Sequence, residues 1–302
     1  MAEAPEHLRP STWTSWEHCP RSWAREHVAG IREPNGWESE VGTMAHAVLL
    51  GTGELPGLYC DAPERRTLER AQQHAHTMHT APHPDRPPRT SIERGEIAER
   101  DFKAKTWRSV LGDFEVEEPS EVDVVATEVE IEWEEAGVPF QCHPDRIERL
   151  PALGPGLSVA DLKTGKVPDK KYAAPHHRQV VIGAMAVAAT MKEGPARQGN
   201  LLYVGQSETI PVDTSLKART AVARAAVEVW EEINVACEQA DTWLDFPVNV
   251  GPLCQWCPAA AECPEGRAFC RKAESGRYKG FSYDNPGSRL VAMADGTYPE
   301  RF

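Results

Sequence analysis

Residues 142–166, CHPDRIERLPALGPGLSVADLKTGK, form the stretch that decides the fold of this chain. The segment LSVADLKTG is apolar enough for a buried strand, and the Pro- and Gly-rich PALGPG before it predicts a turn. Upstream of that turn, PFQCHPDRIERL predicts a strand that pairs with the buried one. Asp145 and Asp161 are then expected near the ends of neighbouring strands, which predicts two carboxylates close together at one edge of a sheet.

Two adjacent carboxylates repel each other unless a cation lies between them. Mg²⁺ or Mn²⁺ suits such a site because hard ions prefer oxygen ligands and keep some of their waters. Lys163 follows Asp161 by two residues, so both side chains lie on the same face of a strand. Its ammonium can orient or help deprotonate an attacking water and neutralise charge on a phosphoryl group. The pattern predicts metal-assisted phosphodiester hydrolysis, although a D-x-K triplet taken alone is more often a surface salt bridge.

Around this stretch the sequence predicts helices, then three strands, a helix, a strand and a long helix. Ser11 is expected to cap a first helix that Pro20 breaks, and a second helix covers about residues 39–50. Alternating glutamates and apolar residues predict a half-exposed strand that starts at Glu128. A helix is expected from about His176 onward.

HPDRIERL followed by LSVADLKTGK resembles the PD-(D/E)XK nuclease superfamily in its RecB-type branch. The segments PDRIE and GTMAHAVLLG are also similar to sequences of phage RecE-like exonucleases. The resemblance implies an α/β fold in which helices flank a mixed central sheet. It also implies an N-terminal helical insert over the active site and a C-terminal Cys-rich segment that binds a cluster.

The same resemblance implies roles for individual residues. Lys163 would be the catalytic lysine, and Gln179 matches the first residue of a Q-x-x-x-Y helix motif, where Gly183 replaces the tyrosine. Cys142 stands where the family has a glycine before the first aspartate. The implied metal ligands are His46 of the motif Gly42-x-x-x-His46, Asp145, Asp161 and the carbonyl of Leu162, and Glu128 falls where related enzymes place a further acidic residue. Taken alone, His46 is more often a core or cap histidine, but its position relative to the other motifs favours a metal ligand. Gln179 could equally be a solvent-facing helix residue.

One early cysteine, Cys19, and a late C-x2-C-x5-C pattern, Cys254, Cys257 and Cys263, form a second candidate site. Four thiolates can hold zinc or an iron–sulfur cluster. The order and spacing resemble those of AddB and Cas4-type nucleases, which implies a structural [4Fe–4S] cluster that joins the two chain ends. The remaining cysteines are expected to be core or surface thiols, with Cys270 as an alternative ligand.

The chain has 302 residues and a formal net charge of −13, which argues against a generic basic nucleic-acid coat. Residues 161–179 carry five Lys or Arg and two Asp, a local net charge of 5 − 2 = +3, in either a substrate channel or a solvated loop. We expect no transmembrane helix and no secretory signal, and therefore a cytoplasmic protein with reduced thiols, acting in a bacterial cell and consistent with phage origin.

We expect a single nuclease domain over residues 1–302. Its parts are N-terminal helices with the first cluster Cys and the ligand His (11–50), a helical insert (51–118), the nuclease core (119–240), the cluster-binding segment (241–275) and a tail (276–302).

The predicted function is Mg²⁺- or Mn²⁺-dependent DNA exonuclease activity on single-stranded ends, with 5′ to 3′ polarity favoured. Such an enzyme would act in recombination, repair or phage DNA processing, with recombination or replication proteins as partners. No P-loop motif accompanies it, so no helicase motor is expected. Two alternatives remain open: a non-catalytic DNA-end-binding or scaffold protein with an iron–sulfur staple, and a zinc-stapled protein that binds or processes RNA.

Overall fold

The computed structural model describes residues 2–150 and 156–272. The turn expected at PALGPG and the tail expected at 276–302 lie outside these residues, apart from Gly156. The chain divides into two compact units, Asn35–Val227 and Met1–Pro34 with Glu228–Phe302.

The 35–227 unit is built on a sheet whose described strands run in the order β1-β4-β5-β6-β7, while β2 and β3 form a separate hairpin. Strands β5 and β6 are parallel, and the other neighbours in the larger sheet are antiparallel. The strands are β1 (Asp123–Thr127), β2 (Ile131–Glu135), β3 (Val138–Cys142), β4 (Arg146–Arg149), β5 (Leu157–Leu162), β6 (Ala196–Tyr203) and β7 (Glu208–Val212). This mixed sheet with flanking helices confirms the predicted fold class.

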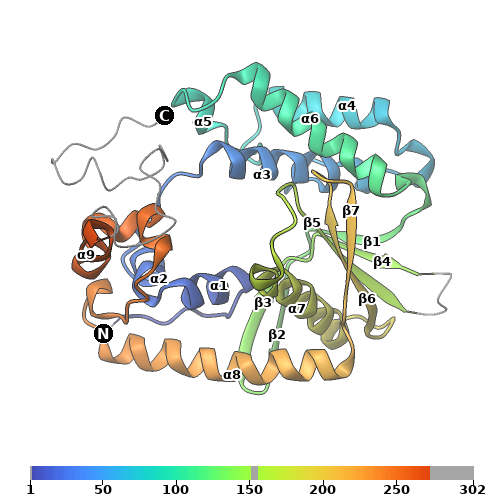
Figure 1. Cartoon of the computed structure of the whole chain (residues 1–302). Coiled ribbons are helices and arrows are strands. Elements are labelled where there is room, and N and C mark those ends of the chain that lie inside the picture. Colours follow the sequence, from blue (N-terminus) through green and yellow to red (C-terminus); the bar gives the residue numbers. More distant parts are fainter. Residues whose placement is uncertain (1, 151–155, 273–302) are drawn as a thin grey trace. The chain divides into compact units, whose positions relative to one another are not determined.

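Helices cover both faces of that sheet (Figure 1). Helices α3, α4 and α6 share an apolar core with one face, to which the sheet contributes Ala160, Leu162 and Leu202 and the turn after β6 contributes Val204. Helix α7 packs on the other face, where Gly199 approaches Val180. The helices of this unit are α3 (Trp37–Leu50), α4 (Leu68–Thr80), α5 (Thr90–Glu93), α6 (Glu99–Val116) and α7 (Ala174–Thr190), and α8 (Leu216–Gln239) runs across the boundary between the units.

Glu128 does not begin a strand, contrary to the alternation of glutamates from 128 to 134. Its backbone is left-handed (φ 48°), so the chain leaves β1 there and starts β2 only at Ile131. The predicted returning strand is likewise divided, because β3 pairs with β2 whereas β4 pairs with β1 and β5. The prediction of one continuous strand was wrong because alternation cannot show where a chain passes from one sheet to another.

The other unit joins the two ends of the described chain around aromatic side chains. The rings of Trp16 and Trp23 meet edge to face with centroids 5.1 Å apart, and Phe246 lies 5.9 Å from Trp23. Arg21 donates a hydrogen bond to the Phe246 carbonyl at 3.1 Å. The helices here are α1 (Pro10–His18), α2 (Pro20–His27), the end of α8 and α9 (Pro264–Lys272). Because burial of large rings is strongly stabilising, these contacts hold segments more than 200 residues apart together.

The start of this unit corrects one predicted detail and confirms another. Ser11 is not the N-cap, because α1 already begins at Pro10 with Arg9 as its cap. Pro20 separates two helices as expected, since α2 starts at that residue. Pro is favoured at the first position of a helix, where its missing N–H costs nothing.

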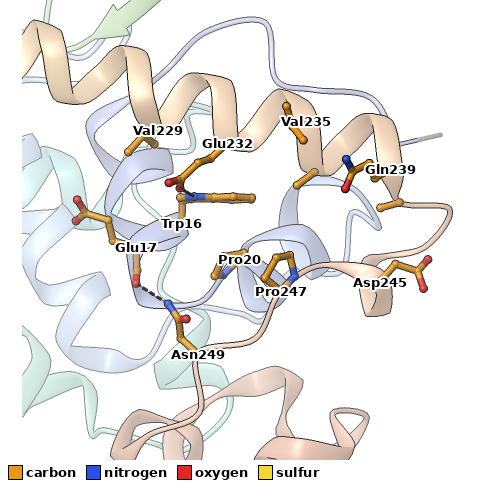
Figure 2. A pocket seen from close by; sticks show the side chains of 12 residues that line it. Trp16, Glu17, Pro20, Val229, Glu232, Val235, Gln239, Asp245, Pro247 and Asn249 are labelled. Atoms are coloured by element: carbon orange, nitrogen blue, oxygen red, sulfur yellow. Dashed lines mark hydrogen bonds between the residues drawn. The ribbon is translucent and has the colours of Figure 1, made fainter.

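A hollow of about 610 Å³ lies in the same unit, between α1 and the end of α8. Figure 2 shows the Trp16 ring in this hollow, where its indole N–H donates to Glu232 at 3.2 Å. The Asn249 amide donates to the Glu17 carbonyl at 3.1 Å. These two bonds tie α1 to α8 and to the segment after it.

No helix within the described residues is both long enough and apolar enough to cross a membrane. Short 3-10 turns complete the two units at Leu58–Cys60, Pro63–Arg65, Pro119–Glu121, Lys170–Tyr172, Trp243–Asp245, Pro252–Trp256 and Pro258–Ala261.

Candidate active site

Strand β5 delivers Asp161 and Lys163 to one place, as their spacing predicts. All six residues of β5 are buried, and the Lys163 ammonium lies 2.7 Å from the Asp161 carboxylate. The parallel ladder continues past the strand end, since the Lys163 N–H donates to the Leu202 carbonyl at 2.8 Å. The lysine is therefore held by β6 as well as by its own strand.

Asp145 lies immediately before β4 and is buried, with a relative exposure of 6%. Its carboxylate accepts a hydrogen bond from the Leu162 N–H at 2.6 Å. This bond fixes the Asp145 side chain against the end of β5, next to Asp161. The two predicted aspartates are thus brought together by the antiparallel pairing of β4 with β5.

His46 reaches the same place from α3. Its Nε2 lies 2.9 Å from the Leu162 carbonyl oxygen. Gly42, one turn earlier, makes this approach feasible, because a Cβ there would be 2.9 Å from the Thr164 hydroxyl. Gly42 and His46 therefore both face the segment after β5.

Glu128 completes the group from the end of β1. Its N–H donates to the Asp145 carbonyl at 3.1 Å, which places the two residues side by side across β1 and β4. A left-handed backbone is uncommon for a residue other than glycine, and such residues concentrate at functional sites. Here the turn accompanies a carboxylate that faces the imidazole of His46.

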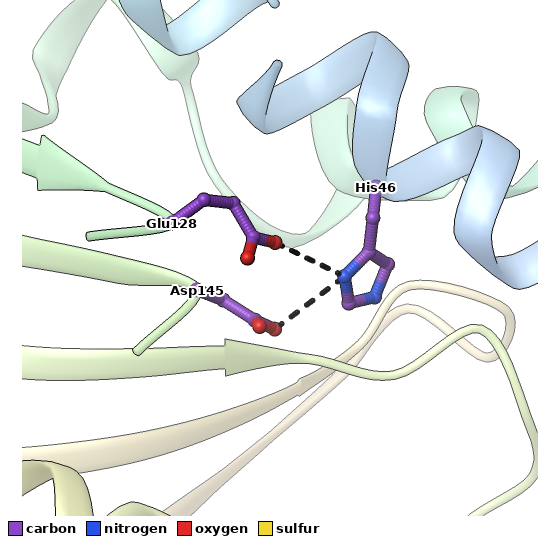
Figure 3. A group of neighbouring side chains, drawn as sticks. All are labelled: His46, Glu128 and Asp145. Atoms are coloured by element: carbon purple, nitrogen blue, oxygen red, sulfur yellow. Dashed lines mark ion pairs between the residues drawn. The ribbon is translucent and has the colours of Figure 1, made fainter. Parts of the chain in front are cut away.

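Figure 3 shows the carboxylates of Glu128 and Asp145 directed at the same ring nitrogen, Nδ1 of His46. Each carboxylate lies 3.8 Å from that nitrogen, and the three ligand atoms all lie within 4.8 Å of one another. Ligands that bind one small divalent ion at about 2.1 Å can be at most about 4.2 Å apart. The donor chemistry, one imidazole and two carboxylates, and the two 3.8 Å distances to His46 suit a Mg²⁺- or Mn²⁺-sized cation.

Contact with the Leu162 carbonyl bears on how His46 would bind a cation. If Nε2 carries the proton and donates it to that carbonyl, Nδ1 presents a lone pair toward Glu128 and Asp145. A hydrogen bond from the other ring nitrogen commonly orients a metal-bound histidine. In this arrangement the Leu162 carbonyl, which was predicted as a ligand, accepts the histidine hydrogen bond with one lone pair and keeps the other.

The site concentrates negative charge. Burial, and then the charge of Asp145, raise the pKa of Asp161 to about 6, and burial also raises the pKa of Asp145. Burial lowers the pKa of His46, but the carboxylates of Asp145 and Glu128 outweigh it and raise that pKa to about 9. Carboxylates that are hard to ionise together indicate a place where a bound cation would be stabilised.

Lys163 is held as a cation. Burial lowers its pKa, but the carboxylates of Asp161 and Asp145 more than compensate, so the pKa of the ammonium lies above its usual value. The ammonium also donates a hydrogen bond to the amide oxygen of Gln179 at 3.1 Å. Gln179, predicted from a helix motif, therefore contacts the lysine from α7.

Two residues that the sequence did not single out for the site lie beside Lys163. Asp161 pairs with Leu201 across β5 and β6, so Tyr203 falls on the same face as Lys163. The Tyr203 hydroxyl lies 2.7 Å from Nδ1 of His176, which is three residues before Gln179 on α7. The only sequence signal was the i, i+3 spacing of His176 and Gln179, which puts both on one helix face.

The two departures from the family pattern have structural causes. Gly183 faces the sheet, and a Cβ there would be 3.0 Å from Val159, so no tyrosine fits at this position. Cys142 ends β3 and is buried, which raises the pKa of its thiol to about 12. A neutral thiol of this kind is a packing residue.

The four predicted cluster cysteines lie in the other unit. Cys19 lies in extended backbone between α1 and α2. Burial raises the pKa of Cys254. The Cys257 thiol donates to the Ser22 hydroxyl at 3.6 Å, and Ser22 lies three residues after Cys19, so the early and late cysteines lie in one neighbourhood. Cys270, the alternative ligand, packs against Cys254 in the same small buried cluster.

Groups around these sulfurs donate hydrogen bonds to them. The backbone N–H groups of Gly251 and Gly266 lie 3.4 Å from Cys254 Sγ and Cys263 Sγ, and the Arg21 guanidinium lies 3.7 Å from Cys263 Sγ. Such donors favour the thiolate form that metal and cluster binding require. Four thiols are a donor set of the kind that binds zinc or an iron–sulfur cluster.

Comparison with known proteins gives a clear family match. The sequence profile described as the PD-(D/E)XK nuclease superfamily matches residues 7–264. A search of curated proteins found no match. Among solved structures, one titled "Crystal structure of SSO0001" matches with a TM-score of 0.35 and 14% identity, covering 80% of this chain and 91% of that chain.

Proposed function

Because the chain belongs to the PD-(D/E)XK nuclease superfamily, we propose that it is a metal-dependent deoxyribonuclease. The observation that carries the proposal is the ligand group of His46, Glu128 and Asp145. Asp145 of this group is hydrogen-bonded to the Leu162 N–H, between the paired residues Asp161 and Lys163. A bound Mg²⁺ or Mn²⁺ would polarise the scissile phosphate and lower the pKa of a bound water. The proposed ligands are His46, Glu128, Asp145, Asp161 and the Leu162 carbonyl.

The chain's own residues then have separate tasks. The Lys163 ammonium lies where it can neutralise charge that develops on the phosphoryl oxygens and orient the attacking water. Gln179 accepts a hydrogen bond from that ammonium and limits its freedom. With its pKa raised, Lys163 acts in this proposal as a cation rather than as a general base.

We extend the proposal to exonuclease action on single-stranded DNA ends, with 5′ to 3′ polarity, in recombination, repair or phage DNA processing. This extension is supported by the resemblance of the cysteine pattern and of the PDRIE and DLKTGK motifs to those of Cas4-type and RecE-like enzymes. Oligonucleotides labelled at the 5′ or the 3′ end test this part, because the polarity decides which label appears first in short products.

We also propose a structural [4Fe–4S] cluster held by Cys19, Cys254, Cys257 and Cys263. The neighbourhood of the four sulfurs and the N–H groups directed at two of them support it. Protein purified without oxygen should be brown and contain about four irons. A colourless protein with one zinc would instead favour the zinc alternative.

The nuclease proposal is tested by incubating the protein with linear DNA and Mn²⁺ and measuring acid-soluble nucleotides. We expect release that EDTA abolishes and that Asp161→Ala lowers by at least about a hundredfold. Binding of DNA ends without any release would favour the non-catalytic alternative.

A further inference from the structure

A cleft of about 600 Å³ opens beside the metal-ligand group, and both His46 and Glu128 line it. The remaining walls come from α3, from the turn at residues 51–53, from residues 85–88 and from His143. A volume of this size is usual for sites that take small ligands or parts of larger ones. Residues 51–53 and 85–88 belong to the helical insert, whose role the family motifs do not explain.

The insert segments in this wall are fixed to each other. The Asp85 carboxylate accepts a hydrogen bond from the Glu54 N–H at 2.8 Å, and the Thr52 hydroxyl donates to the Asp85 carbonyl at 3.1 Å. Gly53 makes room for this contact, since a Cβ there would be 2.1 Å from the Asp85 carboxylate. Gly53 also has a left-handed backbone (φ 50°), which favours glycine. The loop is therefore preorganised.

Arg86 follows Asp85 in this loop and lines the cleft half-buried. Within residues 2–150 and 156–272, no carboxylate forms an ion pair with its guanidinium, whereas the adjacent Asp85 is engaged by the Glu54 N–H. Pro87 and Pro88 come next and restrict the backbone after it. A partly desolvated guanidinium without a carboxylate partner is a strong site for an anion, and its fork matches phosphate geometry.

We propose that this cleft holds the substrate strand beside the scissile bond and that Arg86 binds a backbone phosphate flanking the one at the metal site. This rests on the proposed nuclease function, because the cleft shares His46 and Glu128 with the ligand group. The ligand class is a nucleic acid strand, recognised through its phosphodiester backbone rather than its bases. The insert thereby acts as part of the substrate site.

The test measures binding of fluorescein-labelled oligothymidine by fluorescence anisotropy in Mn²⁺, in a Lys163→Ala background that slows cleavage. We expect Arg86→Ala to weaken binding at least about tenfold, as for loss of a charged hydrogen bond. The logarithm of the association constant falls with the logarithm of the salt concentration. The steepness of that fall should decrease by about 0.7 in Arg86→Ala, the value for one phosphate contact on a single strand. Arg86→Lys should retain the salt slope and recover only part of the affinity.

Arg100→Ala is the matched control. It removes the same charge from the same insert, but that side chain is 90% exposed and pairs with its neighbour Asp101. We expect its affinity to equal that of the parent protein. A set of oligonucleotides, each with a neutral methylphosphonate at one position, then locates the contact. At one position the substitution should lower the affinity of the parent protein but leave the affinity of Arg86→Ala unchanged.

The outcomes separate the two proposals. If wild-type protein degrades DNA but Arg86→Ala binds oligothymidine as tightly as Arg100→Ala, the Arg86 contact is wrong and the nuclease proposal stands. If every methylphosphonate affects both proteins equally, the effect of Arg86 is only structural and the contact is again wrong. If wild-type protein neither cuts nor binds DNA, both proposals fail.

Discussion

Nδ1 of His176 lies 2.7 Å from the hydroxyl of Tyr203. The pair links α7 to the end of β6, one helical turn from the hydrogen bond by which Lys163 contacts Gln179. Burial, and then the nearby Lys163 charge, lower the pKa of His176. A neutral imidazole can accept the tyrosine proton at Nδ1, so two parallel hydrogen bonds attach the lysine region of the sheet to α7.

Tyr203→Phe should therefore slow DNA cleavage by several-fold and lower the free energy of unfolding by about 1 kcal/mol, the usual net value of one hydrogen bond. His176→Ala should lower the cleavage rate to a similar degree. Single-turnover rates of both variants and of the double variant provide the measurement. Because the residues act as a pair, the double variant should be no slower than the slower single one, and additive losses in ΔG‡ would contradict the pairing.

Gly112 on α6 should tolerate no side chain. A Cβ there would be 1.7 Å from the Val204 carbonyl oxygen, which is backbone and cannot rotate away. We expect Gly112→Ala to lower the free energy of unfolding by about 3 kcal/mol, the upper range for overpacking. Gly36→Ala is the comparison in urea unfolding, because its Cβ would meet its nearest neighbour at an ordinary 3.6 Å. Equal midpoints for the two variants would show that α6 does not pack closely against the end of β6.

Asp113 should make stability depend on pH. Burial, and then the charge of Glu117, raise the pKa of Asp113 to about 7. The Tyr59 hydroxyl lies 2.7 Å from Asp113 and 2.6 Å from Glu117. A single hydroxyl proton cannot serve both carboxylates, so a proton on Asp113 satisfies the arrangement.

The sign follows from the two states. Between pH about 4 and 7 the unfolded chain releases the Asp113 proton while the folded chain keeps it, so stability falls as pH rises through this interval. Because the pKa of Asp113 in the folded chain exceeds that in the unfolded chain by about three, the free energy of unfolding falls by at most about 4 kcal/mol. Asp113→Asn should remove this dependence. In urea titrations, the free energy of unfolding of the variant minus that of wild type should therefore increase from pH 4 to 7. A constant difference across that range would mean that Asp113 is ionised in the folded protein.

Loss of Cys19 should destabilise the unit that contains both chain ends. We expect Cys19→Ser to lose the visible absorbance of the anaerobic protein and to melt at a lower temperature, because cluster binding contributes to folding. Cys60→Ser is the matched control, since that thiol is exposed and lies outside the cysteine group. Retention of absorbance and melting temperature by Cys19→Ser would exclude Cys19 as a ligand.

Much of the site could be predicted because it depends on local spacing. Alternation on a strand puts Asp161 and Lys163 on one face, and the strand that follows Asp145 pairs with theirs. Tyr203 could not be predicted in the same way, because its position depends on the register of β6 against β5 across a helical crossover. The left-handed backbone at Glu128 could not be predicted either, because the alternation of glutamates with apolar residues shows no break at that position.

Lys163 and the adjacent carboxylates form the metal-dependent nuclease site that we propose. The decisive measurement is the single-turnover cleavage rate of Lys163→Ala against that of wild type, at saturating Mn²⁺. We expect a rate at least about a hundredfold lower for Lys163→Ala, with DNA binding weakened far less, because the ammonium stabilises charge that develops during reaction. Cleavage by Lys163→Ala at the wild-type rate would contradict this proposal.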